Sequence, residues 1–327
     1  MAKYKEIGGT PVAFKSGSEE YTYPSPEGEL FYNSSNGQFQ FVGLGTGAWS
    51  SGGSITSTSR FGVRGAGTLT AGLIFGGETP PGTTVALTEK YDGTSWTEVN
   101  DLPVGLGYQT GVGTQTAALS ISGINDSPPI GYVVDTFHFD GTSWSEGGDT
   151  PGARQGTAGA GIQTAALWHG GTGPGSPNTV ATKQYNGSSW TEVGNLNTAR
   201  TSHAGTGTVT AALAIANSPV AAIVEAYDGT SWTEVGDLNT ARDSLGGVGT
   251  QTASLVFGGN TPPNTVNTEE WNGTSWTEVN NLATGRRNMA STGTGTTSAM
   301  SSGGLPTPSV TTEEWTFSHA IKTVTTS

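Results

Sequence analysis

One phrase of about twelve residues returns along this chain and restricts its fold more than any other feature. Each copy has a Trp shortly after an Asp-Gly or Asn-Gly pair; the copies are YDGTSWTEVNDL (91–102), FDGTSWSEGGDT (139–150), YNGSSWTEVGNL (185–196), YDGTSWTEVGDL (227–238) and WNGTSWTEVNNL (271–282). A second, Gly-rich apolar phrase occurs six times, as GTLTAGLIFGG (67–77), GTQTAALSISG (113–123), GIQTAALWHGG (161–171), GTVTAALAIAN (207–217), GTQTASLVFGG (249–259) and GTGTTSAMSSGG (293–304). Internal periods of this length are typical of solenoids and propellers.

The spacing of the Trp residues gives the size of the repeating unit. They stand 42 to 48 residues apart, at Trp49, Trp96, Trp144, Trp190, Trp232 and Trp276. Four short strands with their turns fill such an interval, which is the length of a propeller blade. Each pair such as Asp92-Gly93 predicts a hairpin between the third and fourth strands, with positive φ at both central residues. We therefore expect an all-β, six-bladed β-propeller.

The sixth copy of the repeat lacks its last strand. After the Gly pair at 303–304 the chain gives VTTEEWTF (310–317), which matches the third strand of the fifth copy, and no Trp strand follows. The missing strand stands near the N-terminus as GTGAWSSGGS (45–54). Closing a ring with strands from both ends removes two exposed sheet edges. We expect Trp49 to lie beside the 310–317 strand.

Residues 1–45 do not fit the repeat and form a predicted anchor segment, with the propeller at 46–327. GELFYNSSNGQFQF (28–41) predicts a hairpin, because apolar residues alternate on both sides of a Ser-Ser-Asn-Gly turn. A lone hairpin is marginally stable. We therefore expect this segment to be held by a partner, or by folding back on the propeller.

Composition excludes several classes of function. The net charge is −13, so the chain lacks the basic surface that a nucleic-acid-binding protein needs. It has no cysteine, which excludes disulfides and thiolate chemistry and fits folding in a reducing cytoplasm. No signal peptide and no apolar run of transmembrane length is present. We expect no membrane insertion.

The chain resembles Kelch-repeat propellers. The residues that carry the resemblance are the Gly76-Gly77 pair, Tyr91, Trp96 and the NTAR segment at 197–200, although the turn between Tyr91 and Trp96 is shorter than in that family. The repeat sequence, which is highly uniform from copy to copy and is preceded by GELFYNSSNGQFQF, is similar to that of propeller proteins of marine tailed phages. This resemblance implies a virion appendage or fibre protein.

Enzymatic readings find little support in the residues. The copper site of galactose oxidase, also a Kelch propeller, requires a Tyr–Cys crosslink, which a chain without cysteine cannot form. A sialidase-like site requires a Tyr–Glu pair and three convergent arginines, whereas the Asp92–Trp96 turn only resembles a structural Asp box. The histidines His138, His169, His203 and His319 lie in different copies with no two at metal-ligand spacing. We expect no catalytic residues, metal or cofactor.

One arginine recurs seven residues before the Gly-rich phrase. These residues are Arg60, Arg154, Arg200, Arg242 and Arg286, and the second copy has Leu106 at this position. Such a ring could bind an anion at one mouth of the channel, since Arg pairs with carboxylates through two parallel hydrogen bonds. Alternatively, each Arg ties a connecting loop through acids such as Glu192 or Asp237, or through carbonyls. Repetition favours the structural alternative, because a binding site is usually asymmetric.

The loops between the second and third strands vary from copy to copy and are rich in proline. Variable loops on a rigid scaffold commonly carry binding, and proline lowers the entropy lost when they bind. The candidate binding residues are Pro80, Pro81, Asn125, Asp126, Pro128, Pro129, Pro174, Pro177, Pro262, Pro263 and Pro306. The alternative is that these loops are only stiff spacers.

The tryptophans have a structural and a functional interpretation as well. Exposed Trp stacks on sugars, but a Trp at the same place in every copy predicts packing between blades. Trp168 and Trp315 lie off this register, and we expect both to belong to the core.

The leading interpretation is a non-enzymatic virion structural protein of a tailed phage, assembled in the host cytoplasm. Its N-terminal segment would bind other virion proteins, and its loops would face a host-surface glycan or protein. The alternatives are a free-standing bacterial lectin or interaction domain and, third, a sialidase-like carbohydrate-active enzyme. Association of several copies is left open.

Overall fold

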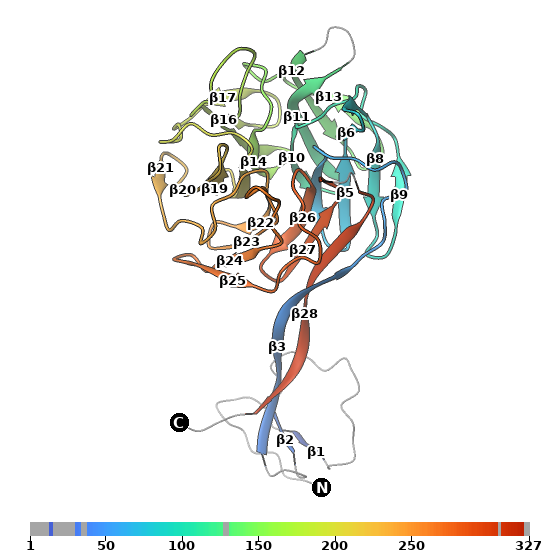
Figure 1. The fold of residues 1–327 in the computed structure, drawn as a ribbon, viewed down its shortest axis with the longest axis vertical. Coiled ribbons are helices and arrows are strands. Elements are labelled where there is room, and N and C mark those ends of the chain that lie inside the picture. The colour runs from blue at the N-terminus through green and yellow to red at the C-terminus, as the bar shows by residue number, and fades with distance from the viewer. Residues whose placement is uncertain (1–12, 16–29, 34–37, 127–130, 307–308, 324–327) are drawn as a thin grey trace. The chain divides into compact units, whose positions relative to one another are not determined.

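A computed structural model describes residues 13–15, 30–33, 38–126, 131–306 and 309–323. These residues contain strands and no helix, and Figure 1 shows their main sheets arranged around one axis. Five of these sheets have four strands, and the sixth has six strands, four of which form a blade. The predicted all-β, six-bladed propeller is confirmed. The described residues accordingly include no helix long and apolar enough to cross a membrane.

Each of the first five blades is an antiparallel sheet whose strands follow chain order. Blade 1 holds β4 (Arg64–Thr68), β5 (Ala71–Phe75), β8 (Thr88–Tyr91) and β9 (Trp96–Val99); blade 2 holds β10 (Thr110–Thr114), β11 (Ala117–Asn125), β12 (Gly131–Phe139) and β13 (Trp144–Glu146); blade 3 holds β14 (Ala158–Ile162), β15 (Ala165–His169), β16 (Thr182–Tyr185) and β17 (Trp190–Glu192). Blade 4 holds β18 (Ala204–Thr208), β19 (Ala211–Asn217), β20 (Ala221–Tyr227) and β21 (Trp232–Glu234), and blade 5 holds β22 (Gly246–Thr250), β23 (Ala253–Phe257), β24 (Thr268–Trp271) and β25 (Trp276–Val279). The first strands contact one another around the ring, so they are the innermost.

The sixth blade is completed from the other end of the chain, as predicted. Its order is β26 (Ala290–Gly295), β27 (Ser298–Ser302), β28 (Thr312–Thr323) and β3 (Gln38–Ser51). The rings of Trp49 and Trp315 have centroids 5.6 Å apart. Closure therefore joins strands from both ends of the chain in one sheet, which completes the ring.

The hydrophobic core lies between adjacent blades. One cluster joins Leu73 and Phe75 of blade 1 to Phe139 and Trp144 of blade 2, and Phe75 meets Trp144 edge to face at a centroid distance of 4.9 Å. The predicted core positions of Trp168 and Trp315 are confirmed, since both are fully buried.

The chain divides into two compact units, Met1–Ala48 with Phe317–Ser327, and Trp49–Thr316. The sequence predicted one boundary at residue 45 and assigned everything after it to the propeller. The contacts instead place 317–327 with the N-terminal segment, because β28 runs on to Thr323 beside β3. In the smaller unit, β2 (Leu30–Asn33) pairs antiparallel with β3, Leu30 with Phe41, within the segment where a hairpin was predicted, and β1 (Ala13–Lys15) pairs with β2 in parallel.

The hairpins between third and fourth strands occur where they were predicted, but their turn type was wrong. Gly93 has φ of +95°, whereas Asp92 is not among the residues with positive φ. Tyr91 pairs with Trp96, so four residues form the loop, and Asp92 Oδ1 accepts the N–H groups of Thr94 and Ser95, each at 2.8 Å. These hydrogen bonds stabilise a longer turn than the two-residue type, which needs positive φ twice.

Candidate functional site

The innermost strands surround a narrow central channel. Glycines face it in pairs, such as Gly159 and Gly161, and adjacent blades approach closely there. A Cβ on Gly205 would lie 2.6 Å from the carbonyl oxygen of Gly159, and one on Gly111 would lie 2.8 Å from that of Gly65. Side chains larger than hydrogen do not fit at these points, so the repeated glycines set the diameter of the channel.

A closed ring of six backbone hydrogen bonds borders the channel. It is formed by one residue of each blade, and these residues are Gly62, Tyr108, Gly156, Ser202, Ser244 and Asn288. Each donates its N–H to the carbonyl oxygen of its counterpart in the preceding blade, over 2.7 to 3.3 Å, and Gly62 donates to Asn288 to close the ring. All six have φ between 52° and 63°, a left-handed conformation that residues with a Cβ rarely adopt. We call this set the mouth ring.

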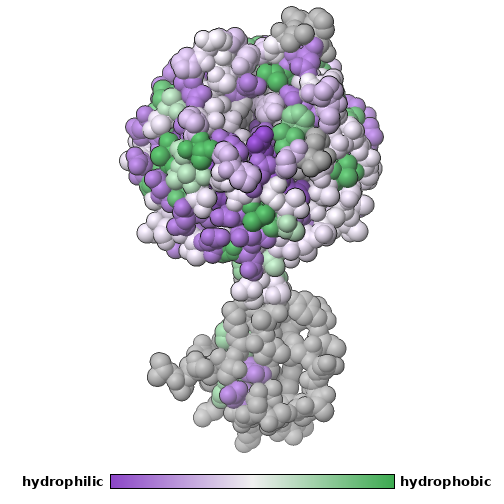
Figure 2. Space-filling view, viewed as in Figure 1, coloured by the Kyte–Doolittle hydropathy of each residue, from purple (hydrophilic) through white to green (hydrophobic). Residues whose placement is uncertain are grey.

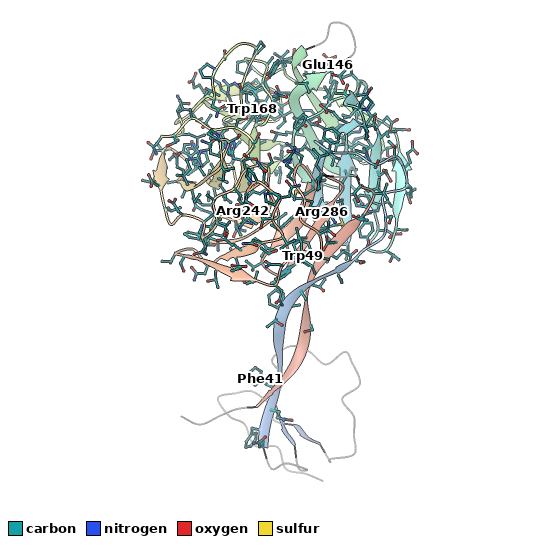
Figure 3. The ribbon with its side chains drawn as sticks, viewed as in Figure 1. Phe41, Trp49, Glu146, Trp168, Arg242 and Arg286 are labelled. Atoms are coloured by element: carbon teal, nitrogen blue, oxygen red, sulfur yellow. The ribbon has the colours of Figure 1, made fainter. Side chains whose placement is uncertain are left out.

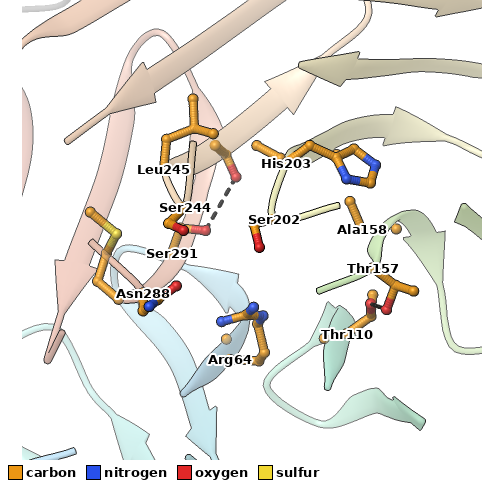
Figure 4. Close-up of a pocket in the computed structure, with 17 residues that line it drawn as sticks. Arg64, Thr110, Thr157, Ala158, Ser202, His203, Ser244, Leu245, Asn288 and Ser291 are labelled. Carbon is orange, nitrogen blue, oxygen red and sulfur yellow. Dashed lines mark hydrogen bonds between the residues drawn. The ribbon is translucent and has the colours of Figure 1, made fainter. Parts of the chain in front are cut away.

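A pocket of about 100 Å³ lies in the channel next to the mouth ring (Figure 4). Its polar side chains include Arg64, Ser202, Ser244 and Asn288. No carboxylate is among its lining residues, although the chain has 26 acidic residues. The pocket is therefore a neutral-to-cationic space in an acidic protein.

Arg64 is the first residue of β4 and supplies the charge of this pocket. Its Nη1 donates 3.0 Å to the carbonyl oxygen of Val63, and none of the ion pairs in the described residues includes it. Desolvation lowers its pKa below the ordinary value for arginine, to about 10, against an opposing effect of Tyr108. The guanidinium keeps its charge at neutral pH without a counter-ion from the protein.

The repeated arginines do not line this pocket. Four of them form buried ion pairs with a Glu on the third strand of the same blade: Arg60 with Glu89, Arg200 with Glu225, Arg242 with Glu269, and Arg286 with Glu313. The guanidinium groups also donate to backbone carbonyls; Arg242 Nη1, for example, donates to Gly258 and Asn267. Figure 3 labels Arg242 and Arg286, which lie in neighbouring blades. These contacts agree with the structural alternative, in which each Arg ties a connecting loop.

The prediction that acids such as Glu192 and Asp237 pair with the repeated arginines was wrong. Glu192 pairs with Lys183 at 2.8 Å, and Asp237 accepts the N–H of Val224. The true partners lie on the third strands, far from the arginines in sequence, and each also accepts an N–H from the segment that precedes its Arg. Asn239 N–H donates 2.7 Å to Glu269, for example, and Thr56 N–H donates 2.7 Å to Glu89.

Blades 2 and 3 lack this Glu. Blade 2 has Leu106 and Phe137 in place of the pair, and both belong to one apolar cluster. Blade 3 has Lys183 at the Glu position, and Arg154 lies over the ring of Trp168, 4.8 Å from its centroid. Both blades also carry a proline where the other blades donate an N–H to the Glu; these residues are Pro103 and Pro151. The loss of the acceptor therefore accompanies the loss of the donor.

The repeated tryptophans join each blade to the one before it, as their repetition predicted. Trp144 Nε1 donates 3.1 Å to Thr88 Oγ1 of blade 1, and Trp96, Trp190, Trp232 and Trp49 make the same contact to Thr312, Thr136, Thr182 and Thr268. Blade 4 has Val224 at the Thr position, and there Trp276 donates to the carbonyl oxygen of Gly236.

Two histidines that sequence spacing kept apart are in contact. His169 of blade 3 and His203, which opens blade 4, are both buried, and their Nδ1 and Nε2 atoms lie 2.9 Å apart. Separation into different blades does not separate residues in space, because adjacent blades pack face to face. Burial lowers the pKa of His169 to about 3, and that of His203 falls well below its usual value. The expectation of packed histidines holds for this pair; the side chain of His319 lies outside the described residues.

The Pro-rich loops surround the mouth ring. Short bridges tie their bases to the segments before the inner strands, as between Phe61 and Glu78 and between Asp243 and Asn260. Neighbouring loops also touch, since Thr84 N–H donates 2.7 Å to Asp126 and Asn264 Nδ2 donates 3.0 Å to the Leu305 carbonyl. The exposed candidate residues are Pro80, Pro81, Pro174, Pro177, Pro262, Pro263 and Pro306; Asn125 and Asp126 are half-buried, and Pro128 and Pro129 lie outside the described residues. The face seen in Figure 2 mixes hydrophilic residues with scattered hydrophobic ones.

One acidic cluster was not anticipated. Asp135, Glu146 and Asp149 of blade 2 bring carboxylate oxygens within 4.8 Å of one another. Burial raises the pKa of Asp135, and the charges of Asp149 and Glu146 raise it further. Exposed acidic groups often gather without an ion, so this cluster by itself does not indicate a metal site.

Comparison with known proteins does not assign the chain. No family model matches it, and no curated protein does. Function must therefore be argued from the propeller itself.

The sequence-based search missed Arg64, although a signal for it exists. The corresponding first residues of the other inner strands are Thr110, Ala158, Ala204, Gly246 and Ala290. A lone Arg at a position that is otherwise small breaks the symmetry of the repeat, and a binding site is usually asymmetric. We therefore take two candidate sites, which are the pocket around Arg64 and the Pro-rich loops that surround the mouth ring.

Proposed function

We propose that this protein is a non-enzymatic virion protein of a tailed phage, a Kelch-like propeller that displays its Pro-rich loops for attachment to a host-surface glycan or protein. The observation that carries the proposal is the division of labour within each blade. The repeated Trp, Arg and Glu residues are engaged in contacts within and between blades. The loops at 78–85, 171–180 and 260–266 differ from blade to blade and expose their prolines on one face.

The geometry of the Pro-rich loops supports a role in binding. Their bases are fixed by bridges to the inner segments, whereas tip residues such as Pro174 and Pro177 are exposed. A fixed base with an exposed, stiff tip loses little entropy on binding. Loops placed in this way commonly carry recognition.

The N-terminal segment 1–45 is proposed to hold the protein on the particle through other virion proteins. The hairpin of β2 and β3 supports this role, because a small hairpin gains most of its stability from what it packs against. Immunogold labelling of purified tailed-phage particles tests it. Finding the protein free in bacterial cells and absent from particles would favour the free-standing lectin.

Loop attachment is tested with the full chain on a glycan array and on intact host cells. Gly-Ser replacement of residues 79–82 and 174–177 should abolish saturable binding while the base contacts of Thr84 and Asn178 are kept. The control is Thr142→Ala with Thr230→Ala, in exposed turns between third and fourth strands; antiparallel connectivity puts these turns on the opposite face of the ring. Equal binding by the loop variant would contradict the proposal, and turnover of a glycan would favour the enzyme.

A further inference from the structure

The polar groups around Arg64 form an incomplete hydrogen-bonding site. Within the described residues, the side chains of Ser202, Ser244 and Asn288 have no hydrogen-bond partner, although they line the same pocket. Figure 4 shows the side chains of Arg64, Ser202 and Asn288 directed into the same space. Other polar groups of the pocket are engaged: Thr110 with Thr157 at 2.6 Å, and Ser291 with the carbonyl oxygen of Gly247. Three unengaged donors and one guanidinium therefore converge on one volume.

The repeated arginines differ from Arg64 in the partners that their guanidinium groups have. Four repeated arginines are buried, and each has a Glu within hydrogen-bond distance. Arg154, which has no such Glu, lies over Trp168. Arg64, which is only partly buried, pairs with neither an acid nor an aromatic ring among the described residues. An anion that entered the pocket would give Arg64 the counter-charge that the protein does not supply.

The pocket limits the size of that anion. Its volume of about 100 Å³ holds roughly seven to ten waters, taking about 10–15 Å³ for each. Lactate, a small hydroxy acid, has about six heavy atoms and fits this volume, whereas an acidic sugar ring such as glucuronate has about thirteen and would fill it and extend beyond it. A second space of about 110 Å³ lies along the innermost strands, and its lining includes paired glycines such as Gly205 and Gly207.

We propose that the Arg64 pocket binds one small monocarboxylate, a hydroxy acid or acidic monosaccharide, with its carboxylate on the guanidinium and its hydroxyls on Ser202, Ser244 and Asn288. A single carboxylate matches the single charge of Arg64. A phosphate, with close to two negative charges at neutral pH, would leave excess negative charge in a chain whose net charge is already −13. A neutral sugar would leave the guanidinium uncompensated.

The test is calorimetric titration of the full chain with glucuronate, lactate, glucose and inorganic phosphate. We expect glucuronate or lactate to bind once per chain, and glucose and phosphate to bind at least about tenfold more weakly. Arg64→Gln should weaken carboxylate binding by about tenfold or more, since it removes the charge-assisted hydrogen bonds. Lys183→Gln is the matched control, because it removes one positive charge from the Glu192 pair outside the pocket and should leave affinity unchanged.

Asn288→Asp keeps the proposal testable if Arg64→Gln does not fold. The substitution is isosteric, and Asp tolerates the left-handed conformation of this position, but its charge would repel the ligand or occupy Arg64. We expect the same loss of binding, with an unchanged thermal midpoint within a few degrees. Absence of carboxylate binding to the folded wild type at about 10 mM, equal binding by Arg64→Gln, or tighter binding of phosphate would each overturn the proposal. The loops are untouched, so these outcomes are independent of the attachment function.

Discussion

Trp49 Nε1 donates a 2.9 Å hydrogen bond to Thr268 Oγ1, across 219 residues of sequence. The contact belongs to the series in which the Trp of one blade meets the Thr of the preceding blade. Trp49 is the member supplied from the N-terminal end of the chain, and its ring also meets Phe257 of blade 5 at a centroid distance of 4.8 Å. The seam between the fifth and sixth blades therefore includes contacts made by a residue from the N-terminal end of the chain.

Replacement of Trp49 should weaken this seam. Trp49→Ala is expected to cost about 3 kcal/mol in free energy of unfolding, at the low end for a large aromatic because this Trp is partly exposed. Trp49→Phe keeps the ring contacts and loses the hydrogen bond, so about 1 kcal/mol is expected. Urea unfolding of both variants measures the difference. If Trp49→Ala lost less free energy of unfolding than Trp49→Phe, the result would contradict the argument that Trp49 helps to close the ring.

The buried pair Arg242–Glu269 should be replaceable only as a set. Glu269→Gln leaves the buried guanidinium without its counter-charge and the cost is expected to be about 3–5 kcal/mol. The triple variant Asn239→Pro, Arg242→Leu, Glu269→Phe copies the residues that blade 2 has at Pro103, Leu106 and Phe137. We expect it to recover most of the loss, because an apolar set leaves no unpaired charge and proline removes the N–H that made the shorter hydrogen bond to Glu269. A triple variant less stable than Glu269→Gln in urea unfolding would refute this explanation.

Substitution of a channel glycine should be far more costly than substitution of an exposed one. A Cβ at Gly205 would meet three backbone atoms of Gly159, the nearest at 2.6 Å, and Gly205→Ala is expected to cost about 2–3 kcal/mol. The control is Gly152→Ala, since a Cβ there meets nothing within 4 Å and its φ is not positive; it should be neutral or slightly stabilising. Thermal unfolding of the two variants measures this difference, with the lower midpoint expected for Gly205→Ala. Similar midpoints would show that the blades can move apart to admit the Cβ.

The His169–His203 pair should make the propeller sensitive to mild acid. Both histidines have folded-state pKa values below the ordinary 6.5, so the unfolded chain binds protons that the folded chain does not. The contribution of the two neutral histidines to stability is therefore fully present above about pH 6.5. Below this pH the free energy of unfolding falls, by up to about 1.4 kcal/mol per pH unit for each histidine.

The double variant His169→Phe, His203→Leu should remove this dependence. It copies Phe257 and Leu245, which occupy these positions in blade 5, and Phe at 169 can keep the edge contact with Trp232. Urea midpoints between about pH 7.5 and 4.5 compare the two proteins. An unchanged slope in the double variant would mean that other groups cause the acid sensitivity.

The sequence by itself determined the repeating architecture. The spacing of Trp96 and its equivalents gave the blade, and the unmatched ends gave the closure by Trp49. The sequence also showed that Leu106 replaces the repeated Arg in the second copy, although not the Glu with which each Arg pairs. These features are local or periodic, and a period is visible without coordinates.

Only the tertiary structure decided which residues meet across blades. His169 and His203 are 34 residues apart and touch, Arg242 selects Glu269 over the nearer Asp237, and Asp92 uses its carboxylate to make a turn that the Asp-Gly pair alone did not predict. Arg64, Ser202 and Asn288 come from three blades and share one pocket only because the ring closes. A repeat fixes what each blade contains, but the distance between residues of different blades depends on how blades pack around the axis.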